Sequence, residues 1–146
     1  MVTLKDVTIE NWNSIIRLRT SREQSRFVAD NCVSLAQAHY QKECIPLAIY
    51  DDDVAVGFTM YCLDPVDREY WIFRLMVDER HQSKGYGRKA MELLMERIRK
   101  DKEHHRIFIS FEPDNLWAKK LYASLGFVPD GRVVDGEIVY QLVYGH

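Results

Sequence analysis

The most informative stretch of the sequence is Leu75-Met-Val-Asp-Glu-Arg-His-Gln-Ser-Lys-Gly-Tyr-Gly-Arg-Lys-Ala90. Its first residues end a run that predicts a strand, and its last residues open an amphipathic helix. Gly85 and Gly87 let the backbone approach a ligand closely, and a helix N-terminus adds N–H donors and a positive dipole end. The charged residues between 80 and 89 are all cations: Arg80, Lys84, Arg88 and Lys89. The stretch therefore predicts a phosphate-binding loop.

The sequence on either side of this loop predicts an α/β domain around one central sheet. Alternating or aliphatic runs predict strands at Val2–Val7, Pro46–Tyr50, Val54–Cys62, Tyr70–Val77, Arg106–Phe111, Phe127–Val128 and Ile138–Tyr144. Helical spacing of apolar residues predicts helices over Glu10–Arg19, over Phe27–Tyr40 with Val28 on the apolar face, from Tyr86 onward, and over Ala118–Leu125 before Gly126. We expect tight turns at Asp51–Asp53 and Asp135–Gly136.

The loop also fits, in part, the glycine fingerprint of dinucleotide-binding folds. In those folds the glycines directly follow a strand, whereas here a short loop intervenes. Too little chain follows Glu112 to build the second half of such a fold. We therefore expect a phosphate ligand of another kind.

Two motifs together resemble the GNAT superfamily of acyl-CoA N-acyltransferases. Gln82-Ser-Lys-Gly85-Tyr-Gly87 matches its Gln/Arg-x-x-Gly-x-Gly/Ala motif, and the segment from Asn115 to Phe127 is similar to its Asn-x-x-Ala-x-x-Leu-Tyr-x-x-x-Gly-Phe signature. The resemblance covers nearly the whole chain. It implies a single mixed, largely antiparallel sheet of about seven strands with splayed strands 4 and 5, flanked by about four helices.

The resemblance also implies acetyl-CoA as the acetyl donor, with no metal. The residues implied to bind it are Leu75, Met76, Val77, Gln82, Ser83, Lys84, Gly85, Tyr86, Gly87, Arg88, Asn115 and Lys119. Tyr122 matches the family tyrosine that protonates the departing CoA thiolate. The alternative for Asn115 is a helix N-cap, and the alternative for Tyr122 is a core position on an amphipathic helix.

The acceptor is implied by the first third of the chain. The segment from Ser21 to Ala38 looks like the first two helices of bacterial spermine/spermidine (diamine) N-acetyltransferases. A polyamine site needs spaced carboxylates, and Glu23 and Asp30 are the candidates there. Phe73 occupies the position where polyamine acetyltransferases often carry a carboxylate, so Glu112 and Glu69 are considered as substitutes. Another amine acceptor (a protein N-terminus, an aminoglycoside or an amino acid) and a non-catalytic CoA-binding sensor remain alternatives.

Composition limits the other possibilities. The 146 residues are 47% hydrophobic and carry a formal net charge of -2, which predicts one domain over residues 1–146 and no nucleic-acid partner. No run is apolar enough for a membrane span, and no signal peptide is apparent, so we expect a cytoplasmic protein. Three scattered cysteines predict reduced thiols, and no spacing predicts a metal site. A homodimer is common in the resembled family, and the apolar strand Ile138–Tyr144 is a candidate for joining it.

Overall fold

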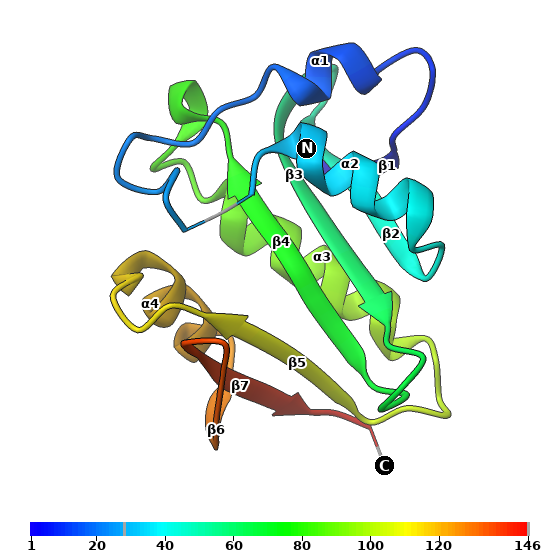
Figure 1. Cartoon of the computed structure of the whole chain (residues 1–146). Coiled ribbons are helices and arrows are strands. Elements are labelled where there is room, and N and C mark those ends of the chain that lie inside the picture. The colour runs from blue at the N-terminus through cyan, green and yellow to red at the C-terminus, as the bar shows by residue number, and fades with distance from the viewer. Residues whose placement is uncertain (28, 146) are drawn as a thin grey trace.

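A computed structural model describes residues 1–27 and 29–145 of the chain. Its centre is one seven-stranded sheet in the order β1-β2-β3-β4-β5-β7-β6 (Figure 1). The strands are β1 (Val2–Asp6), β2 (Cys44–Asp51), β3 (Val54–Leu63), β4 (Tyr70–Val77), β5 (Arg106–Phe111), β6 (Val128–Val134) and β7 (Glu137–Val143). The helices are α1 (Trp12–Ile16), α2 (Asn31–Tyr40), the 3-10 turn η1 (Glu79–His81), α3 (Tyr86–Arg99) and α4 (Leu116–Ser124). The α/β fold class and its element order are confirmed.

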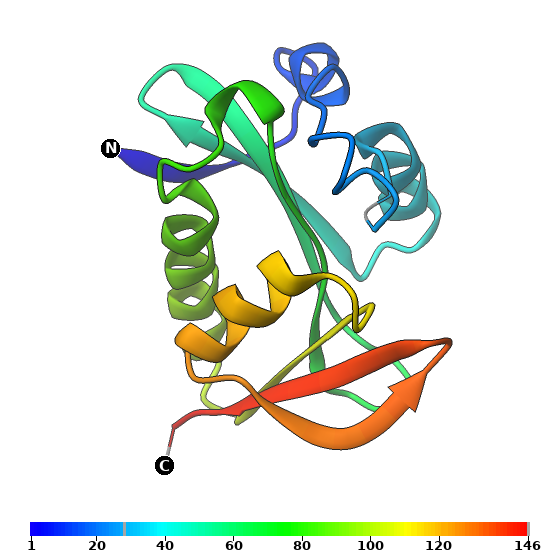
Figure 2. The ribbon, with the colours of Figure 1, turned by 90° about the vertical axis from the view of Figure 1, so that its left-hand side faces the viewer.

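The helices form layers on the two faces of the sheet (Figure 2). Side chains of β4 alternate between the two faces, with a shift of the alternation at the extra residue Phe73, and this separates the core into two clusters. Ile72 and Leu75 pack with Met91 and Leu94 of α3 on one face. Phe73 and Met76 belong to a second cluster, which also holds Ile15 of α1. Burial on both faces explains the apolar character of the central strands.

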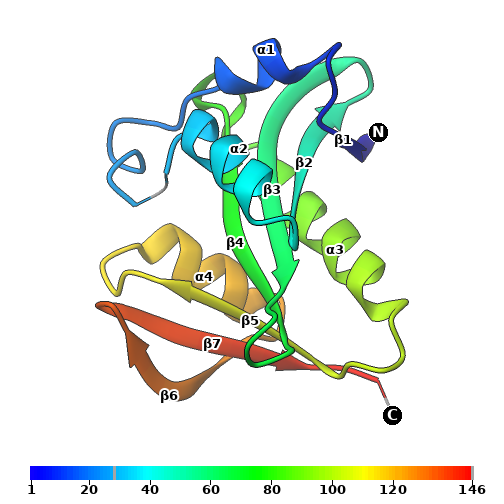
Figure 3. The ribbon, with the colours of Figure 1, turned by 45° about the vertical axis from the view of Figure 1, so that its right-hand side comes forward.

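Strands β4 and β5 are splayed, as the resemblance implies. They are the one parallel pair among the described strands, and their register covers only Tyr70↔Ile107 to Ile72↔Ile109. Beyond Ile72 the two strands diverge (Figure 3). The register of β4 against β3 also shifts there, between Met60 and Tyr61, so that Phe73 is an extra residue in the ladder. This bulge bends β4 away at the point where the opening begins.

Two predicted helices begin or end elsewhere than expected. The first is confined to Trp12–Ile16, and the second begins at Asn31, not at Phe27. The carboxylate of Asp30 caps α2 by accepting a hydrogen bond from the Val33 N–H at 3.0 Å, which fixes this start. The described residues of the segment from 20 to 30 are turns and loop, and Val28 lies outside the described residues. The side chain of Phe27 does not lie on a helix face, as the sequence predicted, but lines a cavity.

The turns and strand ends at the C-terminal half follow the sequence more closely. Gly126 ends α4 at a φ of +100°, as a C-terminal glycine does, and both Asp135 and Gly136 have positive φ in the β6–β7 turn. Strand β6 is longer than the expected Phe127–Val128, because a bulge between Pro129 and Val133 carries the chain on as an edge strand.

Two further features concern surfaces and thiols. Among the described residues, helices long and apolar enough to cross a membrane are absent. The three cysteines are free thiols, with Cys32 exposed and Cys44 and Cys62 buried. Burial raises the pKa of Cys62 to about 12, so this thiol stays protonated and behaves as a core residue.

Candidate active site

The predicted phosphate loop borders a cavity of about 360 Å³ at the end of β4. Gly85 caps α3 with a φ of +79°, and nothing lies within 4 Å of where a side-chain carbon would be, so the backbone there faces open space. Gly87 lies in the first turn of α3, where a Cβ would come within 3.1 Å of Trp117. Gly85 therefore keeps an exposed backbone surface at a helix N-terminus, which is the geometry that binds phosphate, whereas the buried Gly87 lets Trp117 pack closely against the first turn of α3.

Most of the residues predicted to bind the acetyl donor line this first cavity. They are Leu75, Met76, Val77, Gln82, Ser83, Gly85, Tyr86, Gly87 and Arg88. Lys84 and Lys119 are exposed side chains outside the lining of the cavity, and Asn115 lines a different one. The Gln82 side chain donates to the Val77 carbonyl at 3.2 Å, which folds the loop back onto the end of β4. The Arg88 side chain donates a hydrogen bond to the Ser124 hydroxyl at 2.7 Å.

Tyr86 connects the loop to the turn between β2 and β3. Its hydroxyl donates to the Asp51 carboxylate at 2.6 Å, and the N-terminal ammonium lies 3.0 Å from the same side chain. The hydrogen bond to Asp51 raises the pKa of Tyr86 and lowers the pKa of Asp51. This contact holds the first turn of α3 against the β2–β3 turn.

Asp78 anchors the segment from 20 to 30 to the same loop. Its carboxylate is buried and accepts hydrogen bonds from the Arg19 N–H at 2.9 Å and the Arg80 Nε at 2.8 Å. Burial alone acts to raise the pKa of Asp78, but these hydrogen bonds outweigh it and lower the pKa. The segment that begins at Arg19 supplies Glu23 to the first cavity and Phe27 to the second.

The second cavity, of about 460 Å³, occupies the opening between β4 and β5. Leu75 and Trp117 line both cavities, so the two are neighbours. Tyr122 of α4 contributes to the lining while being 5% exposed. Burial raises the pKa of the Tyr122 hydroxyl, which is therefore a protonated donor at neutral pH. Asn115 also lines the cavity, and its side chain caps α4 by accepting from the Ala118 N–H at 3.2 Å.

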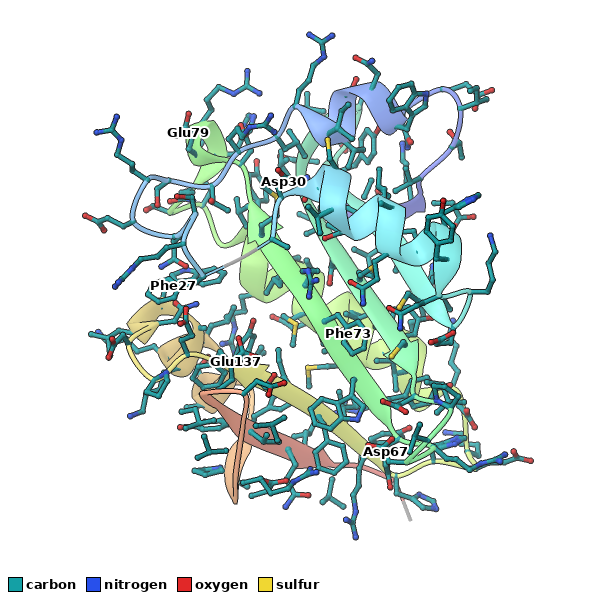
Figure 4. All side chains as sticks on the ribbon, in the orientation of Figure 1. Phe27, Asp30, Asp67, Phe73, Glu79 and Glu137 are labelled. Atoms are coloured by element: carbon teal, nitrogen blue, oxygen red, sulfur yellow. The ribbon has the colours of Figure 1, made fainter. Side chains whose placement is uncertain are left out.

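Charged and aromatic side chains line the rest of the second cavity. Phe73 and Glu137 lie on opposite sides of the opening between β4 and β5, and Phe27 comes from the segment before α2 (Figure 4). Trp71, Phe111, Asp64 and Asp135 also contribute. The one described cation in the lining is Arg74, whose Nη2 donates to the Gln37 side chain at 3.0 Å. Burial lowers the pKa of Arg74, and the nearby Glu137 carboxylate acts against this shift.

The acceptor residues proposed from sequence are dispersed in the structure. Glu23 lines the first cavity, Asp30 caps α2, and Glu112 and Glu69 lie outside the linings of both cavities. Asp64 belongs to the acidic stretch from Asp51 to Glu69, which the sequence offered as a possible attraction for a cation, but Asp135 and Glu137 were missed as site residues. The turn signal at Asp135–Gly136 marked their region, but only the pairing of β7 with β5 brings Glu137 to the site.

Residues 10–127 match the model of the Acetyltransferase (GNAT) family. The chain belongs to this family. It is also 32% identical, over 141 residues, to the spermine/spermidine N(1)-acetyltransferase of Bacillus subtilis (strain 168), covering 90% of this chain and 91% of the relative. This chain is therefore a GNAT acetyltransferase, as the two sequence motifs indicated.

Solved structures show the same fold at lower identity. The spermidine N-acetyltransferase from Vibrio cholerae, solved with CoA and spermine, superposes with a TM-score of 0.76 at 17% identity, covering 97% of this chain and 95% of that one. The ribosomal-protein-S18-alanine N-acetyltransferase from Escherichia coli gives a TM-score of 0.75 at 17% identity, covering 100% and 96%. The GNAT fold thus serves acceptors of different chemistry. Within residues 1–27 and 29–145, clusters of three or more metal-ligating side chains are absent.

Proposed function

We propose that this GNAT acetyltransferase transfers the acetyl group of acetyl-CoA to a primary amine of a polyamine such as spermidine or spermine. One observation carries the proposal. The glycine loop at the start of α3 and a carboxylate-lined cavity meet at the opening between β4 and β5, beside the buried Tyr122 hydroxyl.

The first cavity suits the donor substrate. The open backbone at Gly85 and the N-terminus of α3 offer N–H groups for the CoA pyrophosphate. Among the described residues, the edge of β4 from Phe73 onward has no ladder partner on the β5 side. The Phe73 and Val77 carbonyls accept from the side chains of Arg74 and Gln82, and the other backbone groups of this edge can bind the amides of the pantetheine arm. The acetyl group then reaches the opening that leads to the second cavity.

The reaction needs a proton acceptor for the amine and a proton donor for the thiolate. The acceptor ammonium loses one proton to solvent, and its nitrogen forms a bond to the acetyl carbonyl carbon. The carbon–sulfur bond breaks when the tetrahedral intermediate collapses, and the nitrogen gives up its second proton. Tyr122, protonated and buried at the cavity wall, donates a proton to the sulfur and regains one from solvent.

The second cavity suits a cationic acceptor. Asp64, Asp135 and Glu137 supply negative charge, and Trp71 and Phe73 supply aromatic faces that attract ammonium groups. The curated relative at 32% identity is named a spermine/spermidine acetyltransferase, which supports the same acceptor class.

The experiment is a panel of amines at saturating acetyl-CoA, followed by release of the free CoA thiol and by mass spectrometry of the product. We expect spermidine and spermine to gain 42 Da, the mass of one acetyl group for one proton, with kcat/KM at least about tenfold above the other amines. Absence of turnover on both polyamines would refute the polyamine acceptor.

A second acceptor class is favoured by Arg74. Its guanidinium lines the cavity and would pair with the carboxylate of an amino acid or of an acidic peptide segment. The same positive charge would repel a polycation. An alanyl peptide and free amino acids therefore belong in the panel. A higher kcat/KM for these than for spermidine would favour this second acceptor class.

A further inference from the structure

Glu137 shares a sheet face with the residues that open the second cavity. Along β5, Ile107, Ile109 and Phe111 pack in the cluster beneath α3 and α4, so Phe108 and Ser110 point to the other face. Phe108 stacks on Trp71 there, with ring centroids 5.1 Å apart. In β7, Val139 lies opposite Ser110, and Glu137 is two residues before it on the same face.

Ser110 holds the Glu137 carboxylate at the point where the strands separate. The last paired residues of β4 and β5 are Ile72 and Ile109, and Ser110 follows directly. Its hydroxyl donates to Glu137 Oε1 at 2.8 Å. A carboxylate has about four acceptor positions, and this is the one hydrogen bond to the Glu137 side chain among the described residues. Its remaining acceptor positions are available to a ligand in the cavity that it lines.

The other charged groups in the lining are less suited to the same role. Asp64 is committed to its own turn, with Oδ1 accepting from the Val66 N–H at 2.7 Å. Asp135 is exposed at the tip of the β6–β7 turn. Arg74 is within electrostatic reach of Glu137, but its guanidinium bonds to the Phe73 carbonyl and to Gln37, at 2.9 and 3.0 Å. Among the described residues it makes no ion pair with Glu137 within 4.0 Å.

We propose that Glu137 binds the reacting amino group of a cationic acceptor at the opening between β4 and β5. It supplies from β7 the negative charge that the β4 position, occupied by Phe73, does not carry. Tyr122 belongs to the cluster beneath α3 and α4, so the two side chains flank the opening from opposite faces of the sheet. The acceptor amine therefore enters from the face of Trp71 and Phe73. This inference rests on the proposed amine acetyltransfer and assigns the acceptor subsite.

The test compares Glu137→Gln with the exposed control Glu96→Gln on α3, using spermidine as the acceptor. We expect Glu137→Gln to raise the KM for spermidine about 10- to 100-fold, since it loses a charge-assisted hydrogen bond, while the KM for acetyl-CoA changes less than about twofold. Glu137→Asp should recover part of the loss, and Glu96→Gln should match the wild type. An unchanged KM for spermidine, or an equal rise in both KM values, would overturn the assignment.

Further measurements distinguish a failure of the role of Glu137 from a failure of the proposed polyamine acceptor. If the wild type acetylates another amine of the panel but neither polyamine, the polyamine acceptor fails, and the same KM comparison is made with that amine. If no amine is turned over, spermidine is titrated calorimetrically into CoA-saturated wild type and Glu137→Gln. Equal affinities of the two proteins would overturn the role of Glu137, whereas weaker binding by the variant would support it.

Discussion

The two cavities are built from different parts of the polypeptide. The first is centred on the backbone of one loop, from the end of β4 to the start of α3, and the segment from 20 to 24 and the helix α4 complete its lining. The second is formed by side chains from the segment before α2, from β4, β5 and α4, and from the β6–β7 hairpin. A backbone site suits the donor, because CoA is the same in every reaction of the family. A side-chain site can change with the acceptor while the sheet stays intact.

The largest expected effect is at the wall of the second cavity. Tyr122→Phe removes only the hydroxyl from a well-packed ring, so we expect kcat to fall about 100-fold or more while the Kd for CoA stays within about twofold. Tyr140→Phe is the matched control, since Tyr140 is similarly buried in the same cluster but lies outside the linings of both cavities. Thiol release and calorimetric titration of CoA provide the two readouts. Equal rates for Tyr122→Phe and the wild type would remove Tyr122 from the reaction.

Asp78, which follows β4, holds the start of the segment from 20 to 30, and this segment contributes to both cavities. Asp78→Asn should lower the free energy of unfolding by about 1.5–3 kcal/mol at pH 7, because it weakens hydrogen bonds to a buried charge. The native pKa of Asp78 is lowered, so its stabilisation is present above the unfolded value, about 3.9, and is lost as pH falls through the native value. Urea unfolding at pH 7 and near pH 3 should therefore show a smaller difference for the variant than for the wild type. Asp53→Asn, at an exposed turn, is the control.

The backbone character of the first cavity can be tested with two glycines. Gly85 and Gly131 have φ values of +79° and +93°, and at neither does any atom lie within 4 Å of the place a side-chain carbon would take. Alanine at either position should cost about 1 kcal/mol of stability through backbone strain. Only Gly85→Ala should also raise the Kd for CoA, by about tenfold, since Gly131 lies in β6 outside the linings of both cavities. Equal CoA affinities for the two variants would argue against a backbone phosphate site at Gly85.

The smallest expected effect concerns Arg74 in the second cavity. Arg74→Gln removes a cation that opposes a polyamine, so the KM for spermidine should fall about threefold, with the KM for acetyl-CoA unchanged. Arg97→Gln, at an exposed position of α3, is the control. A rise in the KM for spermidine would show that Arg74 supports polyamine binding, and the cavity would then need a different electrostatic description.

The fold and the first cavity could be largely predicted from sequence because their signals are local. The glycine loop, the strand before it and the helix after it lie within Leu75–Ala90. The start of α2 could not be predicted in this way, since the apolar side chain of Phe27 suits a helix face as well as a loop over a cavity. Glu137 could not be assigned either. Its role depends on β7 inserting beside β5, a long-range pairing that no local pattern encodes.

The most direct test of the two-cavity account is the Kd of a bisubstrate conjugate in which CoA is joined to spermidine through an acetyl linker. If donor and acceptor meet between β4 and β5, the conjugate should bind at least about 100-fold more tightly than CoA. Both Gly85→Ala and Glu137→Gln should weaken its binding. A conjugate that binds no more tightly than CoA, with an affinity insensitive to Glu137→Gln, would contradict the account.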